Sequence, residues 1–202
     1  MADDAKGPDL SPWEVLDEAR VLDAAPWMDV YRQRVRLPGG EVVDDYYRVR
    51  LPEYVIVVAL TGDDRVLMLR GYRHGVGRTT LGVVGGLMDQ PGEEPLETAR
   101  RELLEETGYA GGRWTALGDH VPHSNYGCGV AHLFLAAGVE RRAEPCSGDL
   151  EQTELLAVPR QEALELLRQG EIASLAGVAA LALALNPLLH DPNGDPPGED
   201  HG

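Results

Sequence analysis

Apolar runs and alternating positions along the chain predict several strands and three helices. Residues 54–60 form a near-continuous, β-branched apolar run, which is typical of a strand buried on both faces. Residues 172–185 are rich in Ala and Leu and predict a mostly buried helix. Residues 95–107 predict a further helix, which Gly108 closes at its C-terminal cap. Strands are also predicted over residues 65–70, 79–84, 114–121, 130–137 and 155–158, and a third helix over 161–168 after Pro159.

The first fifty residues predict a separate β lobe. Residues 28–37 and 41–50 read as two strands joined by a Pro-Gly-Gly turn. An isolated hairpin is marginally stable in water, so this one must pack on the core domain or on a second subunit. We therefore divide the chain into the lobe (residues 1–52), a core domain (53–190) and a polar, disordered tail (191–202). The mixed order of strands and helices predicts an α/β fold with a mixed sheet and helices packed on it.

Composition narrows the classes of partner. The formal net charge of −16 disfavours binding to DNA or RNA, which are polyanions. Cys128 and Cys146 are not spaced as zinc ligands, and we expect them to be reduced thiols of a cytoplasmic protein. The first ten residues lack the features of a signal peptide. The longest apolar stretch, residues 175–185, is too short to span a membrane, so no membrane association is expected.

Acidic residues are concentrated in the helix predicted over residues 95–107. Glu102 and Glu106 are one turn apart and share a face, and Glu105 neighbours Glu102. Like charges at these spacings destabilise a bare helix, and its C-terminal end gives carboxylates no favourable dipole interaction. A hard divalent cation such as Mg²⁺ would reverse that penalty. The alternative is a solvated acidic face paired with Arg100 and Arg101.

The residue types and spacing of this segment favour the cation. Residues 101–109, Arg-Glu-Leu-Leu-Glu-Glu-Thr-Gly-Tyr, resemble the Nudix box, G-x5-E-x7-R-E-U-x-E-E-x-G-U, where U is a bulky aliphatic residue. Glu93 stands at the required distance before Arg101. Two positions depart from the pattern: Tyr109 replaces an aliphatic residue, and six residues rather than five separate Gly86 from Glu93. We interpret the second departure as a one-residue loop insertion. The resemblance implies a Nudix hydrolase with an α/β/α sandwich as its catalytic domain.

Other segments resemble the ADP-ribose pyrophosphatase branch of that family. These are residues 72–77, residues 85–89, Pro122, and the run His-Leu-Phe-Leu-Ala at 132–136. The branch implies a homodimer that exchanges an N-terminal β lobe, and the hairpin over residues 28–50 is correctly placed for that role.

The resemblance also implies a metal centre. Glu102 and Glu106 are the expected ligands of two or more Mg²⁺ ions, with Mn²⁺ as an alternative. Glu105 is expected to act as a ligand or catalytic neighbour, and the Gly85 carbonyl as a further ligand. Arg101 is expected to orient the glutamates through charge-assisted hydrogen bonds. Its alternative is an exposed helix arginine.

Further roles follow from the same branch. Glu151 is the expected general base or additional ligand, with Glu154 as the alternate, unless both are solvated loop acids. Arg73 is expected to meet the substrate phosphates, unless it forms a surface salt bridge. Base recognition needs a stacked aromatic ring. The candidates in the lobe are Trp27, Tyr31, Tyr46 and Tyr47, and the sequence does not choose among them.

The expected reaction is Mg²⁺-dependent hydrolysis of the diphosphate of a nucleoside-diphosphate-linked sugar, with ADP-ribose as the leading substrate. GDP-mannose or another such sugar is the close alternative, and a binding protein without turnover is the second class. Two departures bear on the substrate. The branch commonly has Glu at position 82 and Pro at 84, where this chain has Gly82 and Val84, and the loop 123–129 lacks an acidic residue.

Overall fold

The computed structural model describes residues 7, 9–146, 148 and 152–186. The chain divides into two compact units, one formed by Met1–Pro52 with His123–Gly129 and the other by the remaining residues. The first is called the N-terminal unit, and the second, which contains the predicted active site, is called the catalytic unit. The predicted tail at residues 191–202 lies outside the described residues.

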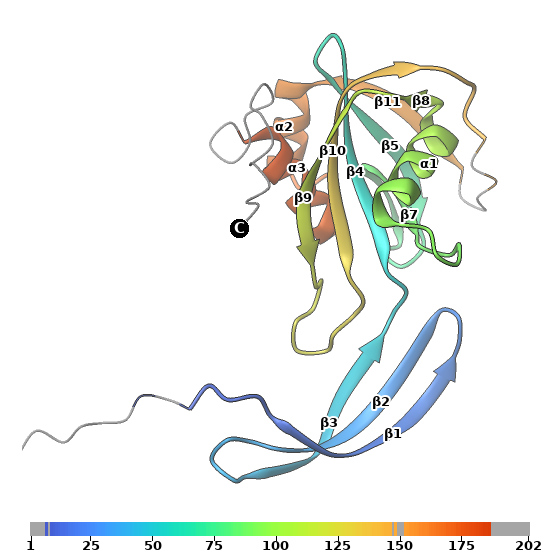
Figure 1. Ribbon diagram of the computed structural model, residues 1–202. Helices are drawn as coiled ribbons and strands as arrows, with labels where there is room; N and C mark the ends of the chain where they lie inside the picture. The colour runs from blue at the N-terminus through green and yellow to red at the C-terminus, as the bar shows by residue number, and fades with distance from the viewer. Residues whose placement is uncertain (1–6, 8, 147, 149–151, 187–202) are drawn as a thin grey trace, which may run out of the picture. The chain divides into compact units, whose positions relative to one another are not determined.

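The N-terminal unit is a three-stranded antiparallel sheet in the order β1-β2-β3 (Figure 1). Its strands are β1 (Glu14–Ala24), β2 (Met28–Arg36) and β3 (Val42–Arg50). The loop of residues 123–129 belongs to this unit, since the Val49 N–H donates a hydrogen bond to the Tyr126 carbonyl at 2.9 Å. The predicted hairpin is therefore two strands of a larger sheet.

Strand β1 was not predicted from the sequence. Its pairing with β2 shifts register between Val15 and Asp17 and again between Arg20 and Leu22. Each shift breaks the alternation of apolar and polar residues that identifies a strand, because successive side chains then no longer point to opposite faces in a regular order. Most side chains of β1 are also exposed, so the strand has no buried stripe.

The catalytic unit is built on a mixed sheet, as predicted. The path β11-β5-β4-β10-β8 forms its body, and β6, β7 and β9 pair with β5, β4 and β10 respectively. Strands β4 and β10 run parallel at the centre, while the other pairs are antiparallel. The strands are β4 (Tyr54–Thr61), β5 (Arg65–Arg73), β6 (Arg78–Gly82), β7 (Val84–Leu87), β8 (Tyr109–Ala110), β9 (Arg113–His120), β10 (Ala131–Arg141) and β11 (Thr153–Pro159).

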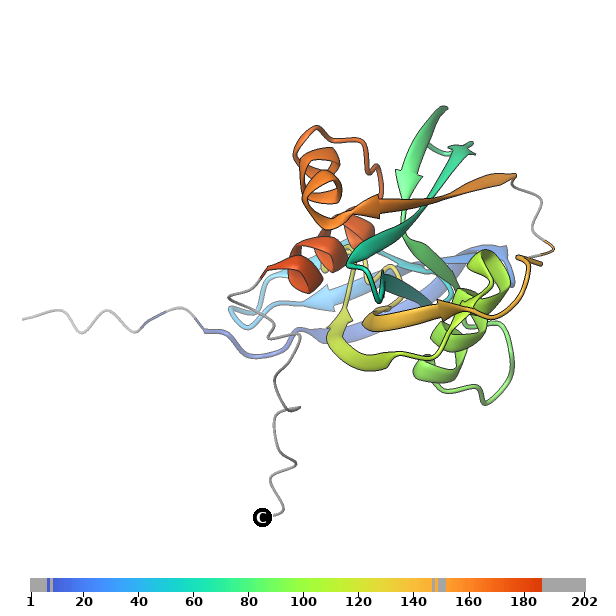
Figure 2. The same cartoon turned by 90° about the horizontal axis from the view of Figure 1, so that it is seen from above.

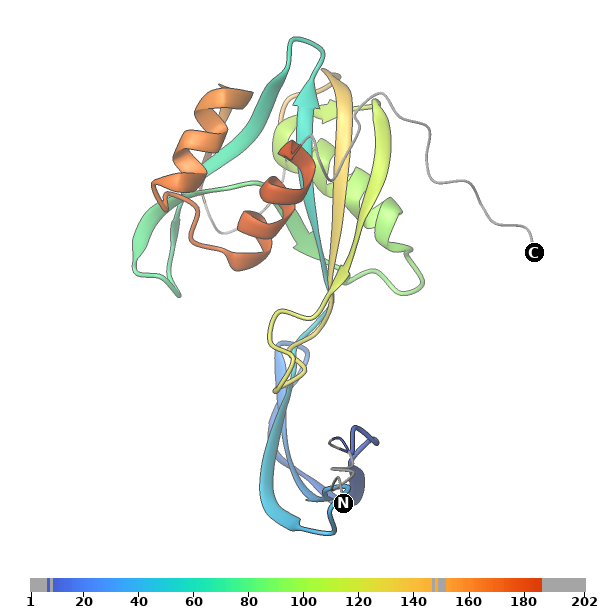
Figure 3. The same cartoon turned by 90° about the vertical axis from the view of Figure 1, so that its left-hand side faces the viewer.

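Helices cover both faces of this sheet (Figures 2 and 3). Helix α1 (Pro95–Thr107) packs on one face with Val55 and Val57 of β4. Helices α2 (Arg160–Arg168) and α3 (Leu175–Leu185) pack on the other with Ile56 and Val58. This arrangement explains why residues 54–60 are apolar at every position: alternate side chains enter two different cores.

Two predicted elements are interrupted in the structure, whereas the other predicted elements differ at most in their end residues. The strand predicted over residues 79–84 is two strands, because the chain leaves β5 after Gly82 and pairs with β4 from Val84 onward. The helix predicted from residue 172 begins at Leu175, with Ser174 as its N-cap. Ile172 instead forms a parallel bridge with Leu81. In both cases the sequence holds a local signal at the break, namely Gly82 within the strand pattern and Ser174 directly before the helix, which the prediction did not use.

Candidate active site

Helix α1 presents the clustered glutamates. Its first turn has a capping box, in which the Glu97 carboxylate accepts a hydrogen bond from the Glu94 backbone N–H at 3.4 Å. It ends at Gly108, which has a left-handed φ of 74°. A Cβ at this position would come within 2.1 Å of the Ala143 carbonyl oxygen, so the backbone requires glycine. The predicted helix over residues 95–107 is thereby confirmed at both ends.

Arg101 lies at the centre of a network of carboxylates. Its Nη1 donates to Glu102 at 2.6 Å and to Glu105 at 3.2 Å. Its Nε and Nη2 donate to Glu93, with Nη2 at 3.1 Å from Oε2. Hydrogen bonds from Arg101 outweigh desolvation and hold the pKa of Glu93 below its usual range, while the same network raises the pKa of Arg101. The planar guanidinium thus donates hydrogen bonds to three acidic side chains and also forms an ion pair with Asp89 at 3.5 Å, and its own side chain is only 20% exposed.

The extra residue of the box lies in the loop before α1. The Glu93 N–H donates a hydrogen bond to the Gln90 carbonyl at 3.2 Å, and this bond closes a turn. Within the turn, Gly92 has a left-handed backbone conformation with φ 79°. Glu93 still reaches Arg101 and also accepts a hydrogen bond from the Thr98 hydroxyl at 2.9 Å. The turn therefore accommodates the additional residue without separating Glu93 from the helix.

Two glutamates of α1 lie against the backbone of β7. The Gly85 N–H donates to Glu106 Oε2 at 3.1 Å. A Cβ on Gly86 would come within 2.0 Å of Glu102 Cδ, so the Glu102 carboxylate occupies the space that a side chain would need. The structure therefore brings together three of the predicted metal ligands, namely Glu102, Glu106 and the backbone of Gly85.

The same groups can be tested for their fit to a divalent cation. Within the described part of the chain, no three acidic, histidine or cysteine side chains converge as ligands of one ion would. Glu102 and Glu105 bond to Arg101 here, and Glu106 bonds to Gly85. Carboxylate and carbonyl oxygens are nevertheless the donors that Mg²⁺ prefers. The residues fit the ion by chemical type and by their location at one strand–helix junction, while the assembly of the ligands stays a prediction.

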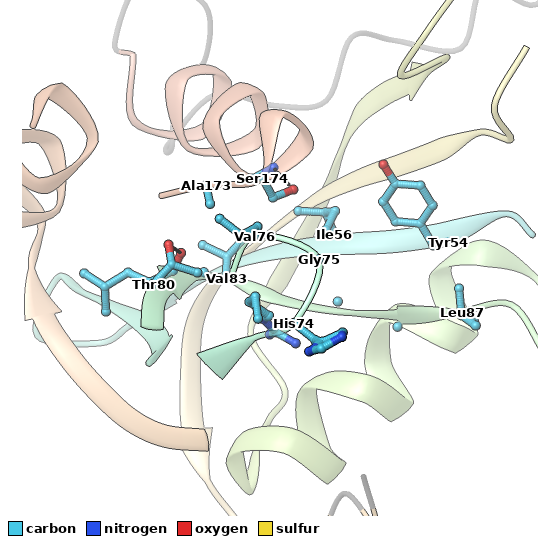
Figure 4. A pocket seen from close by; sticks show the side chains of 16 residues that line it. Tyr54, Ile56, His74, Gly75, Val76, Thr80, Val83, Leu87, Ala173 and Ser174 are labelled. Carbon is cyan, nitrogen blue, oxygen red and sulfur yellow. Dashed lines mark hydrogen bonds between the residues drawn. The ribbon is translucent and has the colours of Figure 1, made fainter. Parts of the chain in front are cut away.

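A cavity of about 480 Å³ borders this junction (Figure 4). Its wall includes Gly85 and Gly86 of β7, and Arg73 at the end of β5, which we predicted to contact phosphates. The remaining wall comes from β4, the residues between β5 and β7, and the start of α3; it includes Tyr54, Ile56, His74, Gly82, Val83 and Ser174. The volume lies within the range of sites for small ligands, which is roughly 300–1,000 Å³.

The other predicted residues are placed as follows. Glu151 lies outside the described residues. Its alternate, Glu154, lies on β11 and forms an exposed ion pair with Arg70 at 3.0 Å. Trp27 and Tyr47 belong to the N-terminal unit, where their exposed fractions are 68% and 45%. The wall of the described cavity comes from the catalytic unit, so the roles of these two rings stay predictions.

One buried polar group was not assigned a role from the sequence. His132 on β10 is 8% exposed, with Nδ1 at 2.8 Å from Asp119 and Nε2 at 3.0 Å from Glu53. Burial alone would lower the pKa of His132, but the hydrogen bonds and charges of Glu53 and Asp119 outweigh it and raise the pKa above its ordinary value. A lone polar residue at the start of the run 132–136 was the only sequence signal for this contact.

Comparisons with known proteins agree with the fold and the glutamate helix. Residues 50–176 match the model of the NUDIX domain, and residues 13–49 match the nucleoside diphosphate sugar hydrolase N-terminal domain. The chain therefore belongs to the Nudix family and is a Nudix hydrolase.

Several relatives define the branch more closely. The chain is 30% identical to an ADP-ribose pyrophosphatase of Bacillus subtilis (strain 168), over 72% of this chain and 78% of the relative. It is 34% identical to a CMP-5'-(N-acetyl-N-hydroxy-3-aminopropyl)phosphonate hydrolase of Streptomyces rubellomurinus (strain ATCC 31215), over 82% and 79%. A crystal structure of an ADP compounds hydrolase shares the fold, with a TM-score of 0.73 and 23% identity over 86% of this chain and 92% of that one. The resemblance to the ADP-ribose pyrophosphatase branch is confirmed by the relative from Bacillus subtilis and by a second ADP-ribose pyrophosphatase, of Mycobacterium tuberculosis (strain ATCC 25618 / H37Rv), at 31% identity over 74% of each chain. None of the helices in the described ranges is long and apolar enough to cross a membrane.

Proposed function

We propose that the protein hydrolyses the diphosphate of a nucleoside-diphosphate-linked sugar, with ADP-ribose as the first candidate and GDP-mannose or another such sugar as the alternative. The observation that carries this proposal is the contact of Glu102 and Glu106 with the β7 backbone, directly beside a cavity that Arg73 lines. The matches to an ADP-ribose pyrophosphatase and to an N-terminal domain of nucleoside diphosphate sugar hydrolases support the substrate class. A binding protein without turnover is the less favoured alternative, since the chain keeps the glutamates of the box.

Mg²⁺, or Mn²⁺ in its place, is the proposed cofactor. Glu102, Glu105, Glu106 and the Gly85 carbonyl would hold it. When bound, the ion lowers the pKa of a water molecule and neutralises charge on the phosphates. Arg101 keeps the glutamates in place and lowers their mutual repulsion, because it donates hydrogen bonds to two of them.

The remaining groups act on the substrate. We propose that Glu151 takes the proton from the attacking water, and that Arg73 binds the phosphates through its guanidinium. Trp27 and Tyr47 are proposed to stack on the base, since exposed aromatic rings of this kind offer flat apolar surface. Cytoplasmic location is part of the proposal and agrees with the two free thiols, Cys128 and Cys146.

We also propose a homodimer in which the N-terminal unit is exchanged between subunits. Among the described residues of this unit, only Gln33 and Val35 are buried, while Trp13, Trp27 and Leu22 are exposed. A three-stranded sheet with so small a core gains stability from a covering surface. The mass of the native species in solution tests this point, and a monomer at micromolar concentration would contradict it.

The reaction is tested by incubating the protein with Mg²⁺ and ADP-ribose, GDP-mannose, ADP-glucose, NADH or diadenosine polyphosphates, and measuring released monophosphates. Selective release of AMP from ADP-ribose supports the leading substrate. Cleavage of another sugar conjugate keeps the chemistry and changes the substrate. Binding of the metal and of nucleotide sugars without any cleavage would favour the alternative of a binding protein.

A further inference from the structure

The described wall of the cavity differs in charge from the rest of the molecule. Aspartate and glutamate make up 34 of the 202 residues, yet the described residues that line the cavity include no Asp, Glu, Asn or Gln. Much of the wall is aliphatic, with Ile56, Val76, Val83 and Leu87 among its side chains. Side-chain carboxylates and amides, the usual acceptors for the hydroxyls of a sugar, are therefore missing from this described wall.

Two of the hydroxyl groups in the wall are already engaged. The Thr80 hydroxyl donates to the Glu171 carbonyl at 2.6 Å. The Ser174 hydroxyl oxygen accepts a hydrogen bond from the Gly177 N–H at 3.3 Å, as the N-cap of α3. Both groups thus serve the protein backbone, which leaves them less capacity to recognise a ligand hydroxyl.

Two glycines of the described wall, Gly75 and Gly82, have open space where a side chain would stand. A Cβ on Gly85 would come within 2.8 Å of Ile56 Cδ1, and a Cβ on Gly86 would collide with Glu102. By contrast, a Cβ on Gly75 or on Gly82 would meet nothing within 4 Å. Gly82 ends β6 with a backbone outside the left-handed region, so a larger residue fits there without strain. Of the two, Gly82 is the one next to β7, which carries Gly85 and Gly86, so a side chain at position 82 would change the room and the chemistry of the cavity beside the glutamate site.

We propose that Gly82 is a specificity-determining position and that the cavity binds the second, non-nucleoside group of the substrate with weak selection for its hydroxyls. This inference rests on the proposed function. The cavity shares Gly85 and Gly86 with the glutamate site, so a group held there lies next to the diphosphate.

The expected selectivity follows from the chemistry of the wall. A site built to hydrogen-bond a hydroxyl rejects the analogue that lacks it by about 10⁴-fold or more, because buried polar groups are then left unpaired. A largely apolar site cannot strongly reject either form and separates the two by no more than about 10²-fold. The protein therefore accepts ADP-ribose together with ADP esters of less hydroxylated alcohols.

The probes are ADP-ribose and ADP esterified with tetrahydrofurfuryl alcohol, which keeps the ring of ribose and lacks its hydroxyls. For the wild type we expect kcat/KM values within about 10²-fold of each other. Gly82→Glu adds a carboxylate acceptor and should raise the preference for ADP-ribose at least about tenfold. Gly82→Leu fills a similar space without an acceptor and should not raise it. Calorimetric binding of ribose 5-phosphate and tetrahydrofurfuryl phosphate gives the same comparison without turnover.

Several results would overturn the inference. Rejection of the tetrahydrofurfuryl ester by about 10⁴-fold in the wild type would do so without any variant. An equal change in Gly82→Glu and Gly82→Leu would show that volume alone matters. If Gly82→Glu alters the preference between ADP-ribose and GDP-ribose but not the preference for hydroxyls, the cavity binds the base instead. Absence of hydrolysis of both esters contradicts the proposed function, and the inference falls with it.

Discussion

The carboxylate of Glu102 occupies the space in which residue 86 would carry a side chain: a Cβ built on Gly86 lies 2.0 Å from Glu102 Cδ and 2.2 Å from its Oε1. The observed position of the Glu102 carboxylate therefore requires a glycine at position 86. Because the obstructing atoms belong to the end of a flexible side chain, Glu102 can move away when a larger residue is present. A substitution at position 86 is thus expected to displace the carboxylate more than it disturbs the fold.

Gly86→Ala should lower kcat/KM by about 10²-fold, the usual effect of shifting a catalytic group by about 1 Å. The thermal midpoint should change little, since the helix and strand keep their cores. Steady-state kinetics and thermal unfolding of the same preparation separate the two effects. Gly62→Ala is the matched control, because a Cβ there meets nothing within 4 Å. Full activity in Gly86→Ala would show that the position of Glu102 is unimportant.

The glutamates of α1 are expected to differ in their contribution to turnover. Glu102→Gln and Glu106→Gln keep the shape of the side chain and an oxygen for the observed hydrogen bonds, but lose the charge that a divalent cation requires. We expect kcat to fall by about 10²-fold or more in each, and Glu105→Gln to lose turnover as well. Glu97→Gln, at an exposed position in the first turn, is the control, since glutamine also serves in a capping box. Unchanged turnover in Glu106→Gln would refute the metal centre proposed above.

Local sequence signals predicted helix α1, whereas the contacts that α1 makes with β7 could not be predicted from local signals. Pro95 and Gly108 mark the ends of α1, because each acts through the backbone of its own turn. The contact between Glu102 and Gly86 joins two elements and was not predicted; the resemblance to the Nudix box implied only that Glu102 and the Gly85 carbonyl are ligands of the same metal centre. The division at Val83 depends on which neighbouring strand each half pairs with; Gly82 marks the place of the break, but no local signal specifies the two partners. Strand β1 was not predicted because its two bulges interrupt the local alternation of apolar and polar residues by which a strand is identified.

Arg101→Lys should impair the site although the charge is conserved. A lysine ammonium cannot donate in the fork geometry that joins Arg101 to Glu93, Glu102 and Glu105. Loss of a group that orients metal ligands typically costs about 10–100-fold in metal affinity or activity. We therefore expect the Mg²⁺ concentration for half-maximal rate to rise by about that factor. Arg100→Lys, at the exposed neighbouring position, should leave the Mg²⁺ dependence unchanged, and an equal effect in both variants would contradict the role of Arg101.

His132 should make the stability of the catalytic unit depend on pH. Both ring nitrogens face carboxylates, Nδ1 toward Asp119 and Nε2 toward Glu53, and only the doubly protonated ring can donate to both. The pKa of His132 is raised in the folded state above its ordinary value of 6.5, so the stabilisation is fully present below about pH 6.5 and is lost as the pH rises through the folded-state pKa. Urea unfolding of the wild type and of His132→Gln should therefore show a larger difference at about pH 6 than at about pH 9. His120→Gln, an exposed residue of β9, controls for the general effect of losing a histidine. A difference between wild type and His132→Gln that is constant with pH would show that the imidazole stays neutral between its two carboxylates.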